Sequence, residues 1–399
     1  MGNAERVLLI EPQGAPGGMW HYVGCLADAL AGAGLDVTLA TIAPYEPLES
    51  RHEIRVCSIG TAANPRLPLP LRLPARAAGQ MERWARLRRL VRTLQPAIVH
   101  VHNPLSKLDF LRFRGLRNIG ARVVYTAHDP RPDTGTTWFD WARFRAADAI
   151  LVHSTNAKND LIAGGIAPSK IARIHHGNYL KFCQETGVPS AEAKRLLGLA
   201  PSARVLLFFG TIMRYKGLDV LLEAFARVSP EHPDLHLVVA GEPLEDFAPY
   251  RRDIERLGIA GRTLLDLRYV PFNEFPKYFA SADAVVFPYR NIYQSGVLQL
   301  AYGYRRPVVG TNVGGLGELI EEDRTGVVAA AEDPRALAAA IQRLLADPVA
   351  AAEMGVRGRR LAESKYAWET VAQRVIEVYR SVHVSVARDH PRSSGALAP

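Results

Sequence analysis

Two basic residues, Arg214 and Lys216, stand in a short loop between a predicted strand and a predicted helix. The strand is the continuous apolar run at 205–209, and apolar residues recur at helical spacing over 218–228. The start of a helix offers backbone N–H groups and the positive end of its dipole to an anion. Two cations in that position predict a phosphate or diphosphate site. The alternative is an ordinary turn with two solvated basic side chains.

A second anion site is predicted where Gln294, Ser295 and Gly296 open another helix, in which Val297 follows. The N–H groups of that helix start and the Ser295 hydroxyl can donate hydrogen bonds to a phosphate.

Candidate residues of the N-terminal half also follow predicted strands. A strand at 6–10 leads into a loop with Gly17 and Gly18, whose spacing fits neither the dinucleotide fingerprint nor the P-loop pattern. His128 follows a strand at 122–127, and a side chain at the carboxyl end of a parallel strand projects into the crevice where ligands bind. Alternatively, Gly17 and Gly18 form a plain turn, and His128 is a histidine of the core.

Metal binding is not expected. His100 and His102 are spaced as on a strand, but no third ligand is near them in the sequence, so we interpret them as structural or as lining a cleft. The three cysteines are scattered and fit neither a disulfide framework nor a metal cluster.

Predicted strands and helices alternate along the chain, which is typical of α/β proteins with parallel sheets. The segments AADAILVHS (146–154) and SADAVVFPY (281–289) resemble one another and suggest two similarly built domains in tandem. We therefore predict two Rossmann-like, doubly wound parallel-sheet domains that face each other across a cleft.

The composition is that of a globular protein, with 48% hydrophobic residues and a formal charge of +9. The longest apolar runs fall far short of the roughly 20 residues of a membrane helix, and no signal peptide is recognisable, so a cytoplasmic protein is expected. Arginines are dense at 66–92, where we predict a loop and then a helix from Gln80. One face of that helix carries the apolar residues Met81, Trp84, Leu87, Val91 and Leu94.

That basic segment has two interpretations: a solvated arginine-rich face beside a core, or a patch that contacts anionic membrane. The arginines outside the apolar face include Arg83, Arg86, Arg88 and Arg89. No nucleic-acid motif accompanies them, so a nucleic-acid partner is not expected.

The stretch GTIMRYKGLDVLLEAF (210–225) resembles the start of the nucleotide-binding domain of GT-B glycosyltransferases, in particular family 4 and related bacterial exopolysaccharide enzymes. The Pro-Val-Val at 307–309, the Thr-x-Val-Gly-Gly at 311–315 and the Thr-Gly at 325–326 fit the same family. The resemblance covers nearly the whole chain, is strong after Val205, and is absent at 66–92. It implies a nucleoside diphosphate sugar, UDP- or GDP-linked, as donor.

Individual roles follow from this resemblance. Lys216, expected to be an exposed loop cation, would hold the donor diphosphate, and His128 would contact the donor sugar. Both, with Arg214, are the expected catalytic residues. The donor-binding residues implied are Gly17, Gly18, Gly210, Thr211, Arg214, Lys216, Gly241, Gln294, Ser295, Gly296 and Val297.

The sequence departs from the family at two places. Thr211 occupies the position of the usual arginine, so only Arg214 could replace it. The usual pair of glutamates, eight residues apart, would fall on Ile292 and Leu300, and Gln294, Ser295 and Gly296 are the proposed replacements.

We expect an acceptor-binding domain at 1–185, a linker at 186–202, a donor-binding domain at 203–366, a helix crossing back at 367–386 and a disordered tail at 387–399. The expected reaction is metal-independent and retaining transfer of a sugar to a hydroxyl of a glycan, a lipid-linked or a small acceptor, without a cofactor. Asp129 and Asp133 are candidate bases. A sugar-nucleotide epimerase and an inactive nucleotide-binding relative are the alternatives, and a lipid-linked acceptor would place the protein at the inner face of the membrane.

Overall fold

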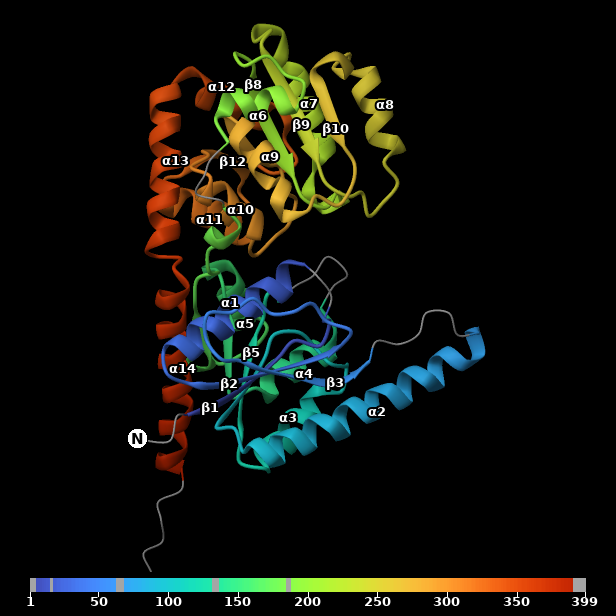
Figure 1. The fold of residues 1–399 in the computed structure, drawn as a ribbon, viewed down its shortest axis with the longest axis vertical. Coiled ribbons are helices and arrows are strands. Elements are labelled where there is room, and N and C mark those ends of the chain that lie inside the picture. The colour runs from blue at the N-terminus through green and yellow to red at the C-terminus, as the bar shows by residue number, and fades with distance from the viewer. Residues whose placement is uncertain (1–4, 15–16, 62–67, 131–135, 184–187, 390–399) are drawn as a thin grey trace, which may run out of the picture. The chain divides into compact units, whose positions relative to one another are not determined.

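The computed structural model describes residues 5–14, 17–61, 68–130, 136–183 and 188–389 (Figure 1). The chain forms two compact units, and each is described by itself. The N-terminal unit comprises Met1–Val152, Lys158–Ile174 and Trp368–Pro399. The C-terminal unit comprises His153–Ala157 and His175–Ala367.

A parallel sheet forms the centre of the N-terminal unit, with strand order β3-β2-β1-β4-β5-β6-β7. Its strands are β1 (Arg6–Ile10), β2 (Asp36–Ala43), β3 (Arg55–Thr61), β4 (Ile98–Val101), β5 (Arg122–Thr126), β6 (Ala149–Val152) and β7 (Ile171–Arg173). The helices between them are α1 (Gly18–Gly32), α2 (Leu69–Leu94), α3 (Asp109–Arg117), α4 (Trp138–Ala146) and α5 (Thr155–Ala163). The order of the strands reverses between β1 and β4, and ligands of such sheets bind at the carboxyl ends of the strands at that point.

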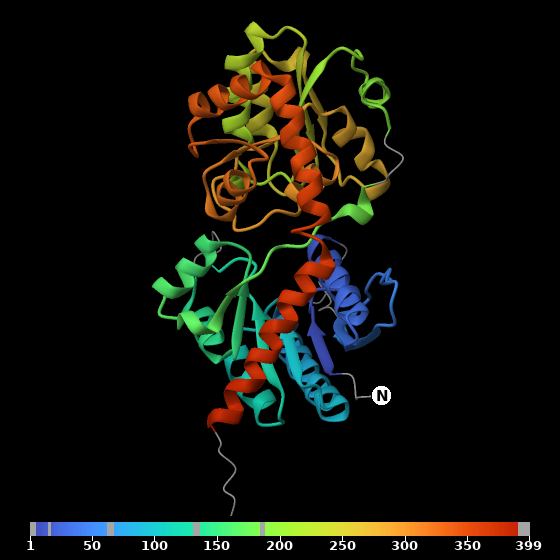
Figure 2. The same ribbon diagram turned by 90° about the vertical axis from the view of Figure 1, so that its left-hand side faces the viewer.

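The last helix, α14 (Trp368–Asp389), packs on this N-terminal sheet (Figure 2). Its buried residues Val371, Val375 and Tyr379 share one apolar cluster with residues of α1 and β1. The Tyr379 hydroxyl lies 2.7 Å from Nδ1 of His100, so this helix also provides a polar contact in the core.

Helix α2 starts earlier than the sequence indicated. We predicted a loop before Gln80, but the helix begins at Leu69, and that prediction is wrong. Proline is compatible with the first turn of a helix, where no N–H bond is lost, so Pro70 did not exclude a helix there. Leu87 and Val91 are buried as expected, whereas Met81 is exposed and does not contribute to the core.

The C-terminal unit repeats the same architecture with a parallel sheet of order β10-β9-β8-β11-β12-β13. Its strands are β8 (Arg204–Phe209), β9 (Leu235–Ala240), β10 (Thr263–Asp266), β11 (Ala284–Phe287), β12 (Val308–Thr311) and β13 (Gly326–Ala329). Its helices are α6 (Ser190–Leu196), α7 (Leu218–Val228), α8 (Ala248–Arg256), α9 (Phe275–Ser281), α10 (Gly296–Gly303), α11 (Gly314–Asp323), α12 (Pro334–Ala346) and α13 (Pro348–Glu363). Two doubly wound parallel-sheet domains were predicted, and both are present. In the sheet of the C-terminal unit, the order of the strands reverses between β8 and β11.

Residues that the sequence assigned to the end of the first domain and to the linker pack with the C-terminal unit instead. The Phe182 ring stacks on Phe272 at 4.3 Å between centroids. In α6, the buried Lys194 Nζ lies 3.1 Å from the Asp283 carboxylate. These contacts place the start of the C-terminal unit at His175 rather than after residue 202.

Candidate functional site

The loop after β8 is shaped by glycines with positive φ that pack against neighbouring backbone. Gly217 has φ 66°, and a Cβ there would lie 2.0 Å from the Pro288 carbonyl oxygen. Gly241, directly after β9, has φ 152°, and a Cβ there would lie 2.0 Å from the Gly210 carbonyl oxygen. Larger residues would therefore push the loop away from its neighbours. Gly241 packs against the backbone of this loop at Gly210, a packing role that the sequence did not indicate.

Lys216 is buried in this loop, with only 6% of its surface exposed. Its Nζ donates a hydrogen bond of 3.0 Å to Thr211 Oγ1 and lies 5.8 Å from the centre of the Tyr289 ring. Burial lowers the pKa of the ammonium from 10.5 to about 8. Within the described parts of the chain, no carboxylate pairs with it. We expected an exposed loop cation, so the sequence prediction of its environment is wrong.

Arg214 is placed differently from Lys216, because its side chain is exposed at the surface of the same loop. Its carbonyl oxygen accepts a hydrogen bond of 2.7 Å from the guanidinium of Arg290. Arg290 also donates to both carboxylate oxygens of Asp219 at 2.9 and 2.7 Å, and this pairing raises its pKa. Arg290 thus fixes the loop to the start of α7, a role that the sequence did not reveal.

The start of α10 lies beside the same loop. Gly210 lies between the two: a Cβ on Gly210 would be 3.5 Å from Val297 Cγ2 and 3.2 Å from Lys216 Nζ. Ser295 is the N-cap residue of α10 and is buried, and a Cβ on Gly296 would clash with the Tyr179 ring at 2.6 Å. The buried Gln294 Oε1 accepts no hydrogen bond from the residues that the structure describes. The structure therefore brings Gly210, Thr211, Lys216 and the start of α10 together at the carboxyl ends of β8 and β11.

In the N-terminal unit, Gly17 is the N-cap residue of α1, with φ 148°. A Cβ there would meet no described atom within 4 Å, and Gly18 is exposed. The loop that leads to it is held by Glu11, a fully buried carboxylate directly after β1. Glu11 accepts hydrogen bonds from the backbone N–H of Gly14 at 2.8 Å and of Gln13 at 3.1 Å.

Glu11 also links the two strands at which the order of this sheet reverses. Its second oxygen accepts a hydrogen bond of 3.2 Å from Asn103 Nδ2, and Asn103 follows β4. This role could not be predicted, because a single glutamate after a strand has no distinctive pattern.

His128 lies just after β5 and is half-buried, with its ring edge-on to Tyr22 at 4.9 Å between centroids. The adjacent Asp129 is exposed, and Asp133 lies outside the described residues. His100 is a core residue whose ring nitrogens contact Tyr379 and Thr126 hydroxyls, both at 2.7 Å. Among the described residues, no three His, Cys, Asp or Glu side chains are grouped so that they could hold a metal ion.

Comparison with known proteins identifies the family. Residues 16–179 match the model of Glycosyltransferase Family 4, and residues 203–347 match that of Glycosyl transferases group 1. The chain is 30% identical to a D-inositol 3-phosphate glycosyltransferase of Corynebacterium diphtheriae, over 95% of this chain and 93% of that protein. The chain belongs to the family 4 glycosyltransferases.

Solved structures show that this glycosyltransferase has the GT-B fold. A sucrose-phosphate synthase from Thermosynechococcus elongatus aligns with a TM-score of 0.75 at 22% identity, covering 96% of this chain and 100% of that one. Anabaena HepE in complex with UDP-glucose aligns with a TM-score of 0.74 at 17% identity, covering 94% of this chain and 99% of that one.

The positions where this glycosyltransferase departs from the family pattern are part of its packing. Leu300 is buried in the apolar core beside α10. Ile292 is half-buried, and its carbonyl oxygen accepts a hydrogen bond of 3.1 Å from the N–H of Gly315. Neither position offers a side chain that could form a hydrogen bond with a sugar hydroxyl.

Proposed function

We propose that this glycosyltransferase transfers a sugar from a nucleoside diphosphate sugar to a hydroxyl group of its acceptor, with retention of configuration and without a metal. The observation that carries the proposal is the buried ammonium of Lys216. A buried charge is costly unless an opposite charge meets it, and the described residues provide no carboxylate for it. A diphosphate is an anion that would provide the missing partner.

The same group would stabilise the transition state. As the bond between the anomeric carbon and the diphosphate oxygen breaks, negative charge grows on the leaving diphosphate. Lys216, the Ser295 hydroxyl and the helix starts of α7 and α10 would be the groups that stabilise that charge. The acceptor oxygen forms the new bond to the anomeric carbon, and its proton leaves to a base or to the departing diphosphate.

In the N-terminal unit, we assign two supporting roles. The backbone N–H groups at the start of α1, at Gly17 and Gly18, would donate to the diphosphate, and His128 would orient the donor sugar. Asp129 is exposed and is the remaining described candidate for a base. Because glutamates are missing at Ile292 and Leu300, inversion is the alternative outcome.

The test is incubation with a panel of UDP- and GDP-linked sugars, with nucleotide release measured with and without acceptor. A transferase releases nucleotide much faster when an acceptor is present, and the anomeric configuration of the product decides between retention and inversion. An epimerase would release nucleotide equally well without acceptor. If the protein binds nucleotide but releases none from any of the donors, it is an inactive nucleotide-binding relative.

We also propose that the acceptor is lipid-linked and that the enzyme works at the inner face of the membrane. The support is the arginine-rich helix α2, on which Arg86, Arg88, Arg89 and Arg92 are exposed. No helix in the described ranges is long and apolar enough to span a bilayer. The name of the Corynebacterium relative indicates an inositol phosphate as the alternative acceptor class. Parallel assays with a lipid-linked sugar and with inositol phosphate would distinguish the two.

A further inference from the structure

Helices α3 and α4 of the N-terminal unit present an exposed apolar surface that the glycosyl transfer reaction does not use. We call it the aromatic face, and it consists of Leu108, Phe110, Leu111, Trp138 and Phe139. Trp138 is 62%, Leu111 52% and Leu108 50% exposed. The Trp138 ring stacks on Phe139 at 4.0 Å and meets Phe110 at 5.6 Å between centroids, so the helices contribute to one continuous surface.

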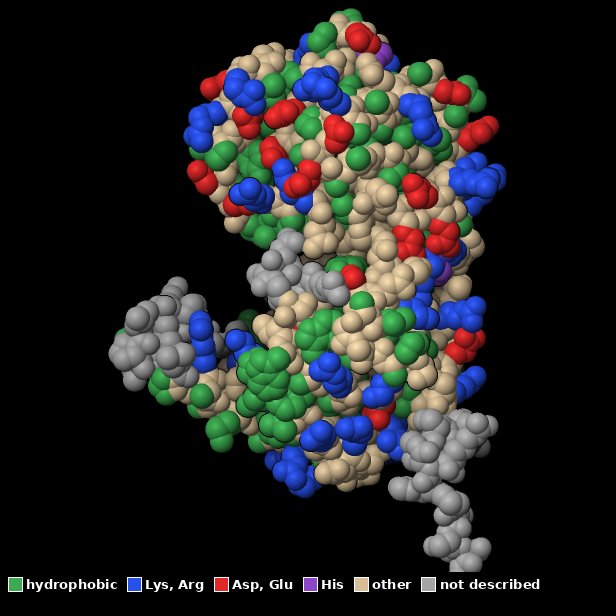
Figure 3. Space-filling model, turned by 180° about the vertical axis from the view of Figure 1, so that it is seen from behind, with side chains coloured by type: hydrophobic (Ala, Val, Ile, Leu, Met, Phe, Trp, Pro, Cys, Tyr) green, Lys and Arg blue, Asp and Glu red, His purple; other side chains and the backbone are tan. Residues whose placement is uncertain are grey.

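Basic side chains surround the aromatic face. Lys107 places its Nζ 5.8 Å from the centre of the Phe139 ring, and Arg114 is exposed one turn after Leu111. Figure 3 shows hydrophobic side chains gathered on the N-terminal unit, with Lys and Arg side chains beside them. Residues 105–117 and 136–146 together contain six basic and two acidic residues.

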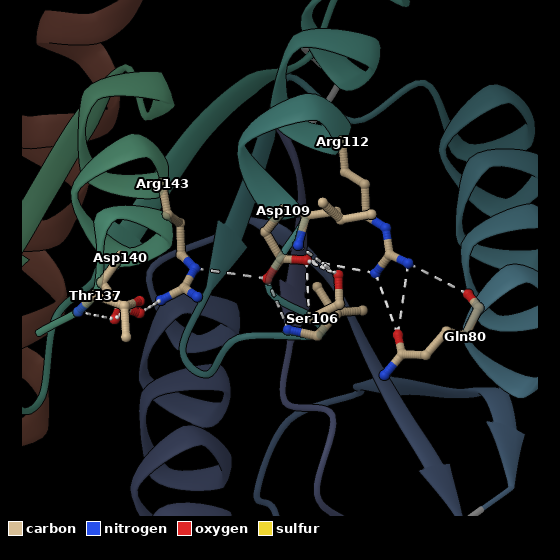
Figure 4. A network of polar contacts seen from close by, with 9 residues as sticks. Gln80, Ser106, Asp109, Arg112, Thr137, Asp140 and Arg143 are labelled. Carbon is tan, nitrogen blue, oxygen red and sulfur yellow. Dashed lines mark hydrogen bonds and ion pairs between the residues drawn. The ribbon is translucent and has the colours of Figure 1, made fainter. Parts of the chain in front are cut away.

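Both acidic residues are already neutralised by arginines beneath the surface (Figure 4). The buried Asp109 carboxylate lies 3.4 Å from Arg112 and 3.7 Å from Arg143, and it also accepts the N–H of Leu105 at 2.8 Å. Asp140 pairs with Arg143 at 3.0 Å. The aromatic face therefore presents no unneutralised carboxylate from these two segments to an anionic partner.

The same network joins the aromatic face to helix α2. Arg112 donates to the Gln80 side chain at 3.5 Å and to its carbonyl oxygen at 3.4 Å, and its guanidinium lies 5.5 Å from the Trp84 ring. The three helices are thus fixed to one another, and the exposed arginines of α2 belong to the same rigid support.

We infer that the aromatic face is the membrane-binding surface of this enzyme and that its partner is a bilayer rich in anionic phospholipid. Trp, Phe and Leu side chains surrounded by Lys and Arg are suited to the boundary between headgroups and acyl chains, where the rings lie among the chains and the cations meet phosphates. The inference extends the membrane location proposed above. It differs in assigning the anchor to α3 and α4, with α2 contributing only charge.

The experiment measures co-sedimentation of the full chain with vesicles of phosphatidylcholine, alone or mixed with an equal part of phosphatidylglycerol, at roughly 0.05 M and 0.5 M salt. Wild type should bind only the mixed vesicles and should dissociate at high salt. The double variant Trp138→Ser with Leu111→Ser should bind about tenfold more weakly or worse, because two side chains no longer enter the bilayer. The double variant Arg88→Gln with Arg89→Gln should weaken binding about fivefold per residue.

A matched control removes equally exposed apolar side chains from the other unit. The double variant Leu196→Ser with Val349→Ser should bind vesicles like wild type. UDP binding and circular dichroism of all variants establish that they are folded and test the donor site independently of the membrane. The inference is overturned if wild type ignores the mixed vesicles at low salt, or if the variant of the aromatic face binds as well as the control. In that case the aromatic face would be assigned to binding a protein partner instead of a membrane.

Discussion

Replacing Lys216 with methionine should make the enzyme more stable and nearly inactive. Burial lowers the pKa of this ammonium from 10.5 to about 8, and each pKa unit corresponds to about 1.4 kcal/mol. Keeping the lysine protonated in the folded state at neutral pH therefore costs about 3 kcal/mol. Methionine keeps most of the volume and removes that cost, although it also removes the hydrogen bond to Thr211.

The pH dependence of this effect has a definite sign. Since the pKa is lower in the folded protein than in the unfolded chain, the unfolded chain binds more protons between about pH 8 and pH 10.5. The free energy of unfolding of wild type should rise with pH across that window. The advantage of the Lys216→Met variant should be largest below pH 8 and should disappear above pH 10.5.

Urea unfolding at neutral and alkaline pH measures the stability, and nucleotide release in the presence of acceptor measures the activity. Turnover should fall about 100-fold or more, because a preorganised charge at the leaving diphosphate is lost. Lys194 is the matched control, since it is also only 6% exposed but is paired with Asp283 at 3.1 Å. Lys194→Met should destabilise the protein by about 1 kcal/mol and leave the turnover of the folded enzyme unchanged.

Two results would refute the reasoning. If Lys216→Met were no more stable than wild type at neutral pH, the ammonium would already have a partner that offsets its burial. If the variant retained turnover within about threefold of wild type, Lys216 would not stabilise the leaving diphosphate.

Four further predictions concern the loop after β8, the loop after β1 and His128 after β5. The affinity for UDP, measured by calorimetry, should fall by up to about tenfold per pH unit above pH 8, because a bound anion needs the protonated lysine; an unchanged affinity up to pH 10 would contradict the site. Arg214→Ala should lower turnover about tenfold if Arg214 replaces the missing family arginine, and a change below twofold would make it a plain surface residue. Glu11→Gln should raise the KM for the donor about tenfold more than it lowers kcat. The amide has one acceptor oxygen instead of two, so its NH2 group would face either the N–H groups of the glycine loop or the Asn103 amide. Glu11→Asp should restore part of the loss, and equal effects on both constants would argue against positioning. His128→Ala should lower kcat with little change in UDP affinity, and a matching loss of UDP affinity would show that His128 serves the nucleotide instead of the sugar.

Much of the fold could be predicted because its signals are local. The strands at 205–209 and 235–240 are unbroken apolar runs, and the helix after Lys216 has regular apolar spacing. The candidate loops follow directly, since each one lies between a strand and a helix. The start of α2 could not be found in this way, because Pro70 lies in the first turn and Pro74 lies inside the helix, where a proline normally breaks it.

The environment of the candidate residues depends on contacts between distant parts of the chain. The Lys216 ammonium lies 5.8 Å from the centre of the Tyr289 ring, and Tyr289 is far from it in the sequence. Arg290 binds Asp219, which lies 71 residues away in the sequence. Phe182 likewise stacks on Phe272, which is also distant in the sequence. A periodic pattern carries no information on such pairs, so the sequence identified the loop but not the state of its lysine.

The two units differ in the charge that follows the first strand of each sheet. Glu11 comes directly after β1, and its carboxylate is satisfied by backbone N–H groups and by Asn103. Lys216 lies in the loop after β8, and within the described residues the only hydrogen bond of its ammonium goes to a hydroxyl. A buried carboxylate repels a diphosphate, whereas a buried ammonium attracts one. The charges therefore make the loop after β8 in the C-terminal unit better suited to bind a diphosphate than the loop after β1 in the N-terminal unit.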